Sequence, residues 1–441
     1  MRLELRRLFA LAIPLAIAEA GTQVMSVVDM AVVGRLGGRE LAACGLANAV
    51  FFGVSVFGLG LMLGIDPLIS QAVGAGDEFS ARRILWQGVW LGLVTAAILT
   101  LILLGGPALL TWIGVKRELI APATTYLLIR LLGLAPWLLF FVVRAYLQAH
   151  HVTRPMVTAM VLGNLLNVVG DILLVFGFGF IPPLGVAGAA ISTVTCQLVA
   201  LAILVAAVMR MHVPAARAWN TDVIRRVLRV GLPTALQVTA EVGIFALVAL
   251  LAGRIGTVDL AAHQLVITLA SFTFTVALGV STAGSVRVGL AVGARDRQAV
   301  RRAGHATFIG AAMVMAVGAM LFMSIPRLLA RMLTNQPAVI AASLPLFFVA
   351  GLFQLSDGLQ AAGIGALRGA ADTKFAFISN LIGYWIVGLP LSLLLGFRLG
   401  MGVIGLWWGF VAGLTTVAIL VFLRFQALSA NEIIPVANVS S

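Results

Sequence analysis

The stretch Gly231-Leu-Pro-Thr-Ala-Leu-Gln-Val-Thr-Ala-Glu241-Val-Gly-Ile-Phe-Ala-Leu-Val-Ala-Leu-Leu251 decides the fold class of this chain. It is almost wholly apolar, contains one charged residue, and reaches the roughly 20 residues that a helix needs to cross a bilayer core. Comparable stretches recur along all 441 residues, which are 61% hydrophobic and only 10% charged. Soluble domains carry about 25% charged residues. We therefore predict an all-α polytopic membrane protein.

The apolar stretches predict twelve transmembrane helices joined by short loops. In chain order the predicted spans are 8–34, 42–66, 86–106, 120–147, 155–178, 185–209, 227–252, 260–285, 303–324, 338–364, 375–397 and 402–424. The longest connection is a basic linker, and no stretch has the composition of a soluble domain. The first span is too long for a signal peptide.

The net charge of +13 is explained by membrane topology rather than by a nucleic-acid partner. If the N-terminus is cytoplasmic, eighteen of the 29 arginines and lysines fall in inner loops or ends, and eight fall in outer loops. An excess of this kind on the cytoplasmic side is the positive-inside rule. We predict a multi-pass protein of the cell inner (plasma) membrane with both termini cytoplasmic, and no nucleic-acid partner.

The two halves of the chain match without gaps at one constant offset. Gly34-Arg-Leu-Gly37 corresponds to Gly253-Arg-Ile-Gly256, and Ala72-Val-Gly-Ala75 corresponds to Ala291-Val-Gly-Ala294. Each half then holds six helices, and both halves point the same way across the membrane. The predicted domains are an N-lobe of helices 1–6 (1–209), the linker (210–226), a C-lobe of helices 7–12 (227–424) and a cytoplasmic tail (425–441). Transporters with parallel repeats place ion and substrate sites in or between such bundles, which rock against each other.

Motifs of enzymes and of ATP-driven pumps are missing from the sequence. No glycine-rich phosphate loop precedes either lysine, Lys116 or Lys374. The five histidines lack zinc-site spacing, and Cys44 and Cys196 lie in or beside apolar spans, where they form no disulfide framework. We therefore predict a protein that is not an enzyme and has no cofactor.

Carboxylates inside the apolar spans are the residues most indicative of function. In the second half these are Glu241 and Asp357. An acid at mid-bilayer costs about 2.5–3.5 kcal/mol on the insertion scale, so it usually marks an ion or substrate path. Gln237 and Phe353 each precede one of these acids by a helical turn, and an aromatic face beside a carboxylate suits a lipophilic cation. Phe353 alone also fits simple core packing.

In the first half, Asp29 and Asp171 are two such acids. Asn164, Asn167 and Asp171 follow one another at spacings of three and four, which places them on one helical face. Together with Asp29 they predict a polar cluster of the size of a cation, in which one of the two neighbouring acids holds a proton near neutral pH. The alternative is a satisfied polar cluster that only holds helices together.

Arg130 and Arg144 both lie in the fourth predicted span. They could pair with intramembrane acids, or extend along the apolar surface so that the charged end reaches the interface. The second interpretation is favoured. Glu19 lies in the first span nearer its cytoplasmic end, and is interpreted as water-exposed lining.

These residues resemble the multidrug and toxic compound extrusion (MATE) family, in its NorM-like bacterial branch. The resemblance spans nearly the whole chain. It rests on Val28-Asp29 with Gly34-Arg-Leu-Gly37, on Glu241 with Leu260-Ala-Ala-His-Gln264, on Ser285-Val-Arg-Val-Gly289, and on Asp357 followed by Gly365-Ala-Leu-Arg-Gly369, Tyr384-Trp385 and Gly388-Leu-Pro390. The family implies a V-shaped pair of six-helix lobes that exports organic cations in exchange for inward Na⁺ or H⁺.

The resemblance also implies two cation sites. The C-lobe site involves Glu241 and Asp357, and the N-lobe site involves Asp29, Asn167 and Asp171; Na⁺ is a possible ligand at the first pair or at the two N-lobe acids. NorM-like proteins often carry a tyrosine one turn before the second C-lobe acid. Phe353 stands there in this chain, so a hydroxyl ligand for Na⁺ is missing at that position.

We predict a secondary active antiporter that exports amphipathic organic cations by alternating access, coupled to Na⁺ or H⁺. Its partners are small-molecule cations and the lipid bilayer, and it is a monomer. Two other interpretations stay open. A lipid-linked precursor flippase of the wider superfamily would need a cavity lined by arginine, whereas acids predominate here. A non-transporting membrane scaffold would show no gradient-dependent flux.

Overall fold

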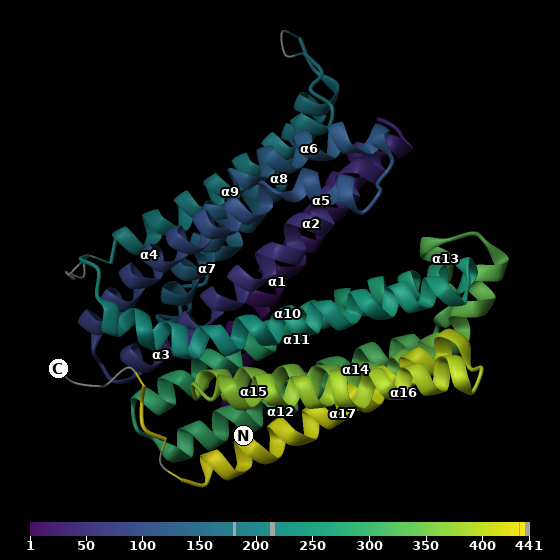
Figure 1. Cartoon of the computed structure of the whole chain (residues 1–441). Coiled ribbons are helices and arrows are strands. Elements are labelled where there is room, and N and C mark those ends of the chain that lie inside the picture. Colours follow the sequence, from purple (N-terminus) through teal and green to yellow (C-terminus); the bar gives the residue numbers. More distant parts are fainter. Residues whose placement is uncertain (180–181, 212–216, 432, 437–441) are drawn as a thin grey trace. The chain divides into compact units, whose positions relative to one another are not determined.

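The computed structural model describes residues 1–179, 182–211, 217–431 and 433–436, and nearly all of them are helical (Figure 1). Residues 212–216 of the predicted linker and 432 and 437–441 of the predicted tail lie outside this description. The first half contains α1 (Arg2–Gly34), α2 (Gly38–Leu63), α3 (Ile65–Gly74), α4 (Glu78–Leu103), α5 (Gly106–Trp112), α6 (Arg117–Leu131), α7 (Leu134–Ala149), α8 (Arg154–Phe176) and α9 (Val186–Met209).

The second half contains α10 (Thr221–Ile255), α11 (Thr257–Gly293), α12 (Arg297–Ser324), α13 (Pro326–Leu333), α14 (Pro337–Gly369), α15 (Thr373–Asn380), the π-helix η1 (Leu381–Gly388), α16 (Leu389–Leu393), the π-helix η2 (Leu394–Arg398) and α17 (Gly402–Ser429). Among the described residues, eleven helices are long and apolar enough to cross a membrane, and the bent pair α6 and α7 makes a twelfth. The prediction of an all-α membrane protein with twelve spans is confirmed.

The internal repeat is visible in how equivalent helices begin. The side chain of Asp77 accepts a hydrogen bond from the Ser80 backbone N–H at 2.9 Å and caps α4. The side chain of Asp296, which corresponds to Asp77 in the repeat, accepts one from the Ala299 N–H at 2.9 Å and caps α12. Such caps satisfy backbone donors that the first helical turn leaves without a partner.

The fourth predicted span, 120–147, is broken into α6 and α7, which are inclined by 41°. The break falls at Leu132 and Gly133, and Pro136 follows in the first turn of α7. The proline nitrogen has no hydrogen to donate to the Leu132 carbonyl, so a continuous helix would lose a hydrogen bond at this point. Each piece alone is too short for a span.

The eleventh span is irregular around Pro390, which also cannot donate to the turn before it. Two π-helical segments, η1 and η2, flank the short α16, and the wider turns of a π-helix are common at functional sites. Here η1 approaches α17 backbone to backbone. A Cβ added to Gly413 would lie 2.8 Å from the Gly383 carbonyl oxygen, so only glycine permits this contact.

The chain divides into two compact units. Unit 1 is Met1–Ala16, Gly74–Gly76 and Leu236–Ser441, and unit 2 is Ile17–Val73 and Asp77–Ala235. The α1 helix passes from unit 1 to unit 2 after Ala16, and α10 passes from unit 2 to unit 1 after Ala235. Ala16 and Ala235 correspond to each other at the repeat offset, so the two crossings are equivalent. The predicted lobes 1–209 and 227–424 remain a prediction.

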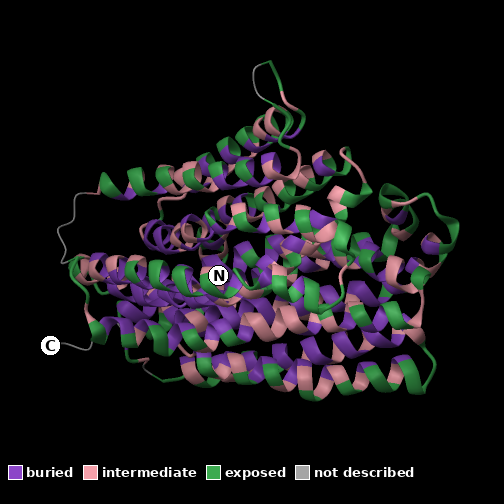
Figure 2. Ribbon diagram, turned by 45° about the horizontal axis from the view of Figure 1, so that its top comes forward, coloured by how far each residue is buried: buried purple, intermediate pink, exposed green. Residues whose placement is uncertain are grey.

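Burial within each helix follows a pattern that suits a lipid environment (Figure 2). Leu101, Leu132 and Leu250 are about 70% exposed, whereas Trp407 and Tyr146 are fully buried. Large apolar side chains on the outer faces would be costly in water and are favourable against lipid tails. Exposed apolar side chains of this size are typical of helices that face lipid.

Candidate functional site

In unit 2, the carboxylate of Asp29 on α1 meets the side chains of α8 and α9. The Asn167 amide Nδ2 donates to Asp29 Oδ1 at 2.7 Å, and the Thr193 hydroxyl donates to Asp29 Oδ2 at 3.2 Å. The same Asn167 Nδ2 lies 3.5 Å from Asp171 Oδ1, so one amide serves both acids. Asn167 and Asp171 are fully buried. We call Asp29, Asn167, Asp171 and Thr193 the unit 2 cluster.

Asn164 is the one predicted member that the structure leaves out of this cluster. Its Nδ2 donates to the Met160 carbonyl oxygen at 2.9 Å and lies 3.1 Å from the Met160 sulfur. Its amide thus returns to its own helix, α8, one turn earlier. The helical spacing correctly placed Asn164 on the same face of α8 as Asn167 and Asp171. Its amide lies too far along the α8 axis to reach Asp29.

In unit 1, Glu241 on α10 accepts hydrogen bonds from side chains of three other elements. Gln360 Nε2 of α14 donates to Glu241 Oε1 at 3.2 Å, and Asn380 Nδ2 of α15 donates to Oε2 at 3.3 Å. The Tyr384 hydroxyl of η1 is 3.5 Å from Oε1. Gln237, one turn earlier on α10, also hydrogen-bonds to this carboxylate. Glu241 is therefore surrounded by neutral donors.

Asp357 joins this second cluster through Gln360, whose Nε2 also lies 3.5 Å from Asp357 Oδ1. Asp357 is 4% exposed and Gln360 is 1% exposed, so both are shielded from solvent. One amide again bridges two acids, as in unit 2. We call Glu241, Asp357, Gln360, Asn380 and Tyr384 the unit 1 cluster.

Phe353, one turn before Asp357, belongs to a buried aromatic group. Its ring lies 5.2 Å from that of Trp407, 6.0 Å from Phe410 and 6.4 Å from Phe245, measured between centroids. Phe245 is 6.1 Å from Tyr384, so the group adjoins the unit 1 cluster. Phe353 is 2% exposed, which matches the packing role considered for it.

Both clusters contain oxygen atoms that a small cation would use. The side-chain carbonyl oxygens of Asn167, Gln360 and Asn380 are buried without a hydrogen-bond partner among the described residues. A side-chain amide can direct its oxygen toward a cation and its NH₂ group toward a carboxylate at the same time. Which of its two end atoms is the oxygen is assigned from the hydrogen-bond network. Carboxylates, amide oxygens and hydroxyls are hard ligands. Within the same part of the chain no group of three or more His, Cys, Asp or Glu side chains is arranged to hold a metal ion.

Intramembrane arginines are paired with acids at two places. Arg144, 5% exposed, forms an ion pair of 2.5 Å with Glu19 in unit 2. Arg287 forms one with Glu4 in unit 1. The favoured expectation that Arg144 extends toward the interface is therefore wrong, because an acid on a neighbouring helix holds it inside. Glu19 is likewise an ion-pair partner rather than free lining.

Four of the residues that donate to the acids were not predicted as site residues from the sequence: Gln360, Asn380, Tyr384 and Thr193. Gln360 follows Asp357 by three residues and so lies on the same helical face. This spacing could have indicated that Gln360 belongs to the site. Asn380 and Tyr384 are one turn apart and also share a face, but nothing in the sequence shows that this face meets Glu241. The same holds for Thr193, which reaches Asp29 from a helix far along the chain.

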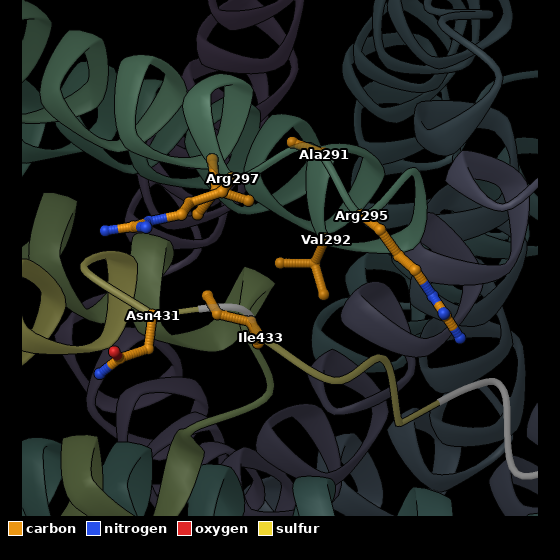
Figure 3. A pocket seen from close by; sticks show the side chains of 7 residues that line it. Ala291, Val292, Arg295, Arg297, Asn431 and Ile433 are labelled. Atoms are coloured by element: carbon orange, nitrogen blue, oxygen red, sulfur yellow. The ribbon is translucent and has the colours of Figure 1, made fainter.

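Two cavities in the described chain lie away from both clusters. One, where α11 ends and α12 begins, is lined by Arg295, Arg297 and Asn431 and has a volume of about 10 Å³, room for one water at most (Figure 3). A second, of about 510 Å³, is an apolar groove lined by residues such as Leu391, Leu395 and Trp408. Neither contains a carboxylate, so neither suits a cation.

The fold and the two clusters together define a class. The chain is a polytopic helical membrane protein built from two sequence repeats, with a pair of carboxylates in each unit, one buried and one half-buried. Intramembrane acids of this kind are associated with ion and substrate paths rather than with enzymatic chemistry.

Comparison with known proteins identifies the family. The MatE family model matches residues 14–173 and 233–394, and the first residues of the two matches correspond at the repeat offset. Probable multidrug resistance proteins NorM from Agrobacterium fabrum and Deinococcus radiodurans are 36% and 35% identical, over 96% of this chain and 93% and 95% of theirs. An outward-facing multidrug resistance MATE family transporter has the same fold, with a TM-score of 0.90 at 22% identity over 97% of this chain and 96% of its own. The chain belongs to the MatE family, and its predicted NorM-like affiliation is confirmed.

Proposed function

We propose that this protein is a secondary active antiporter that exports amphipathic organic cations in exchange for inward Na⁺ or H⁺. It acts as a transporter and not as an enzyme. The family membership and the names of the relatives support efflux of several drugs. The observation that carries the proposal is the bridging amide in each unit: Asn167 between Asp29 and Asp171, and Gln360 between Glu241 and Asp357.

A bridged carboxylate pair can bind either a coupling ion or an organic cation, but not both with full strength. Binding of one cation cancels part of the negative charge of the pair and repels the next cation, because like charges disfavour each other in a low dielectric. Competition of this kind couples the two fluxes as the lobes alternate. One charge that falls through 100 mV supplies about 2.3 kcal/mol, enough for a drug gradient of roughly fiftyfold.

The proposal places the protein in the cell inner membrane with both termini cytoplasmic. The excess of arginine and lysine in the loops on that side supports this orientation. It also takes the six-helix lobes 1–209 and 227–424 as the moving bodies of a monomer. Organic cations and lipid are the partners, and no resident cofactor is required.

Ethidium flux in proteoliposomes tests the proposal, with a Na⁺ gradient and a pH gradient imposed separately. Flux driven by either gradient supports antiport and identifies the ion. Glu241→Gln with Asp357→Asn, and separately Asp29→Asn, are expected to reduce the gradient-driven rate at least tenfold. Glu118→Gln, which neutralises an exposed acid outside both clusters, is the matched control and should leave the rate unchanged. Absence of flux under both gradients would reject the antiporter and favour the flippase.

A further inference from the structure

The short helix α13 (Pro326–Leu333) exposes most of its large apolar side chains. It joins α12 to α14 at one end of unit 1 and packs mainly against α14 (Figure 1). Of its eight residues, all within the described chain, only Ala330 is buried. Leu328, Met332 and Leu333 are 58%, 70% and 50% exposed, and we call these three the apolar face of α13. Such a face is costly in water and favourable against lipid tails.

The two arginines of α13 lie away from its apolar face. Arg327 and Arg331 are four residues apart, so they share one side of the helix. At 3.6 residues per turn, their side of the helix is turned by about 150° from the centre of the apolar face. A helix with an apolar face and a basic face on opposite sides is typical of one that lies in the membrane interface.

Neither arginine has an anionic partner in the part of the chain that the structure describes. Both are exposed, and no described aspartate or glutamate forms an ion pair with either of them. The sequence from Arg297 to Ser356 contains no acid at all. The Cβ atoms of residues one turn apart are about 5–6 Å from each other, so two guanidinium groups at this spacing can bind the same phosphate group.

The equivalent position in unit 2 supports an interfacial location for α13. Pro326 corresponds to Pro107 at the repeat offset, which makes α5 the counterpart of α13. Trp112 at the end of α5 is 85% exposed, and tryptophan is enriched where membrane and water meet. The two arginines, in contrast, correspond to Ala108 and Trp112. Both units therefore have a short helix with exposed apolar residues at this level, but only α13 carries the arginine pair.

We propose that Arg327 and Arg331 form a binding site for the phosphate group of an anionic phospholipid, with the apolar face of α13 against the acyl chains. A zwitterionic lipid offers the same phosphate but carries a cation of its own, which the arginine pair repels. In the orientation proposed above, the site lies in the outer leaflet. The inference goes beyond the export function and does not depend on either carboxylate cluster.

A fluorescent label on the apolar face tests this site. Met332→Cys provides the attachment point, and the native Cys44 and Cys196 are buried and do not compete for the label. The labelled full-length protein is placed in phosphatidylcholine bilayers that contain a small fraction of a quenching lipid. This lipid is phosphatidylglycerol or phosphatidylcholine, with a nitroxide at the same position of the acyl chain. The ratio of the two quenching strengths measures the preference for anionic lipid at α13.

We expect this preference to be about tenfold or more in the wild-type sequence, since each arginine near a membrane surface contributes about fivefold. A label at Met313→Cys is the positional control. Met313 is 54% exposed in the middle of α12 and has no charged residue within one turn, so both lipids should quench there to the same extent.

Variants of the Met332→Cys protein assign the preference to the arginines. Arg327→Gln and Arg331→Gln should each lower it about fivefold, and together they should bring it close to one. Both side chains are exposed, so folding should be unaffected. The two changes Arg327→Lys and Arg331→Lys together keep the charge and should keep most of the preference. Arg301→Gln, which removes an exposed arginine near the opposite end of α12, is the matched control and should leave it unchanged.

Three results would overturn the site: equal quenching by the two lipids in the wild-type sequence, an unchanged preference in the double glutamine variant, or an equal loss in Arg301→Gln. Absence of quenching by either lipid would show that water or protein covers the apolar face, and would overturn it as well. No drug and no ion gradient is present in this assay, so a failure of the export function would not affect the result.

Discussion

The ion pair between Arg144 and Glu19 allows a quantitative test of how unit 2 is held together. Its N···O distance is 2.5 Å, and the two side chains are 7% and 26% exposed. The Arg144 guanidinium also lies 4.6 Å from the centroid of the Phe141 ring. The perturbation is a double-mutant cycle of Arg144→Gln, Glu19→Gln and the two changes combined.

The magnitude follows from burial. Removal of one partner of a fully buried pair costs about 3–5 kcal/mol, since a lone charge is left inside, whereas exposed pairs contribute about 0–1 kcal/mol. Glu19 is partly exposed, so each single change in this pair should cost about 3 kcal/mol of unfolding free energy. The double change leaves two neutral amides that can hydrogen-bond to each other, and should cost no more than about 4 kcal/mol. The coupling energy is then about 2 kcal/mol.

The assay is reversible unfolding in mixed micelles with increasing SDS, followed by circular dichroism. The pair Arg225 and Asp222 serves as a control: its atoms are 3.8 Å apart, both side chains are about three-quarters exposed, and its coupling should be below about 0.5 kcal/mol. If the costs of Arg144→Gln and Glu19→Gln simply add in the double variant, the two residues do not stabilise each other and the argument from burial is refuted.

Two further outcomes are expected. Asn167→Leu removes the amide that serves both acids of the unit 2 cluster and should lower gradient-driven ethidium flux about tenfold, whereas Asn164→Leu, whose amide bonds only to its own helix, should change it little. Gly413→Ala should lower unfolding free energy by about 1–3 kcal/mol, because its Cβ would press against the Gly383 carbonyl oxygen; Gly53→Ala, where no atom lies within 4 Å of an added Cβ, should be neutral or stabilising in the same assay.

The fold could be predicted because its signals are local or periodic. An apolar stretch long enough for the bilayer identifies a span wherever it occurs, and a constant offset between matching segments identifies the repeat. The acids could also be found, since a charge in such a stretch is costly and stands out. Partners on the same helical face, such as Asn167, could be found as well, but those from other elements could not: Asn380 and Tyr384 reach Glu241 from elements far along the chain, and only packing brings them there.

Arg144 shows why some predictions from the sequence were wrong. From the sequence, a long charged side chain near a helix end can reach either the interface or a buried acid, and composition cannot decide between them. The decision depends on which residue of α1 faces α7, and that residue is Glu19. The break at Leu132 and Gly133 is a similar case, because Pro136 signals a possible kink but the 41° angle depends on the helices packed around it.

The repeat explains the scaffold but not the sites. Asp29 corresponds to Val248 at the repeat offset, and Glu241 corresponds to Thr22, so neither acid has an acidic counterpart in the other half. Arg130 likewise corresponds to Val349. The two clusters reached the same chemistry, a pair of carboxylates bridged by one amide, from different helical positions. They are therefore not interchangeable copies.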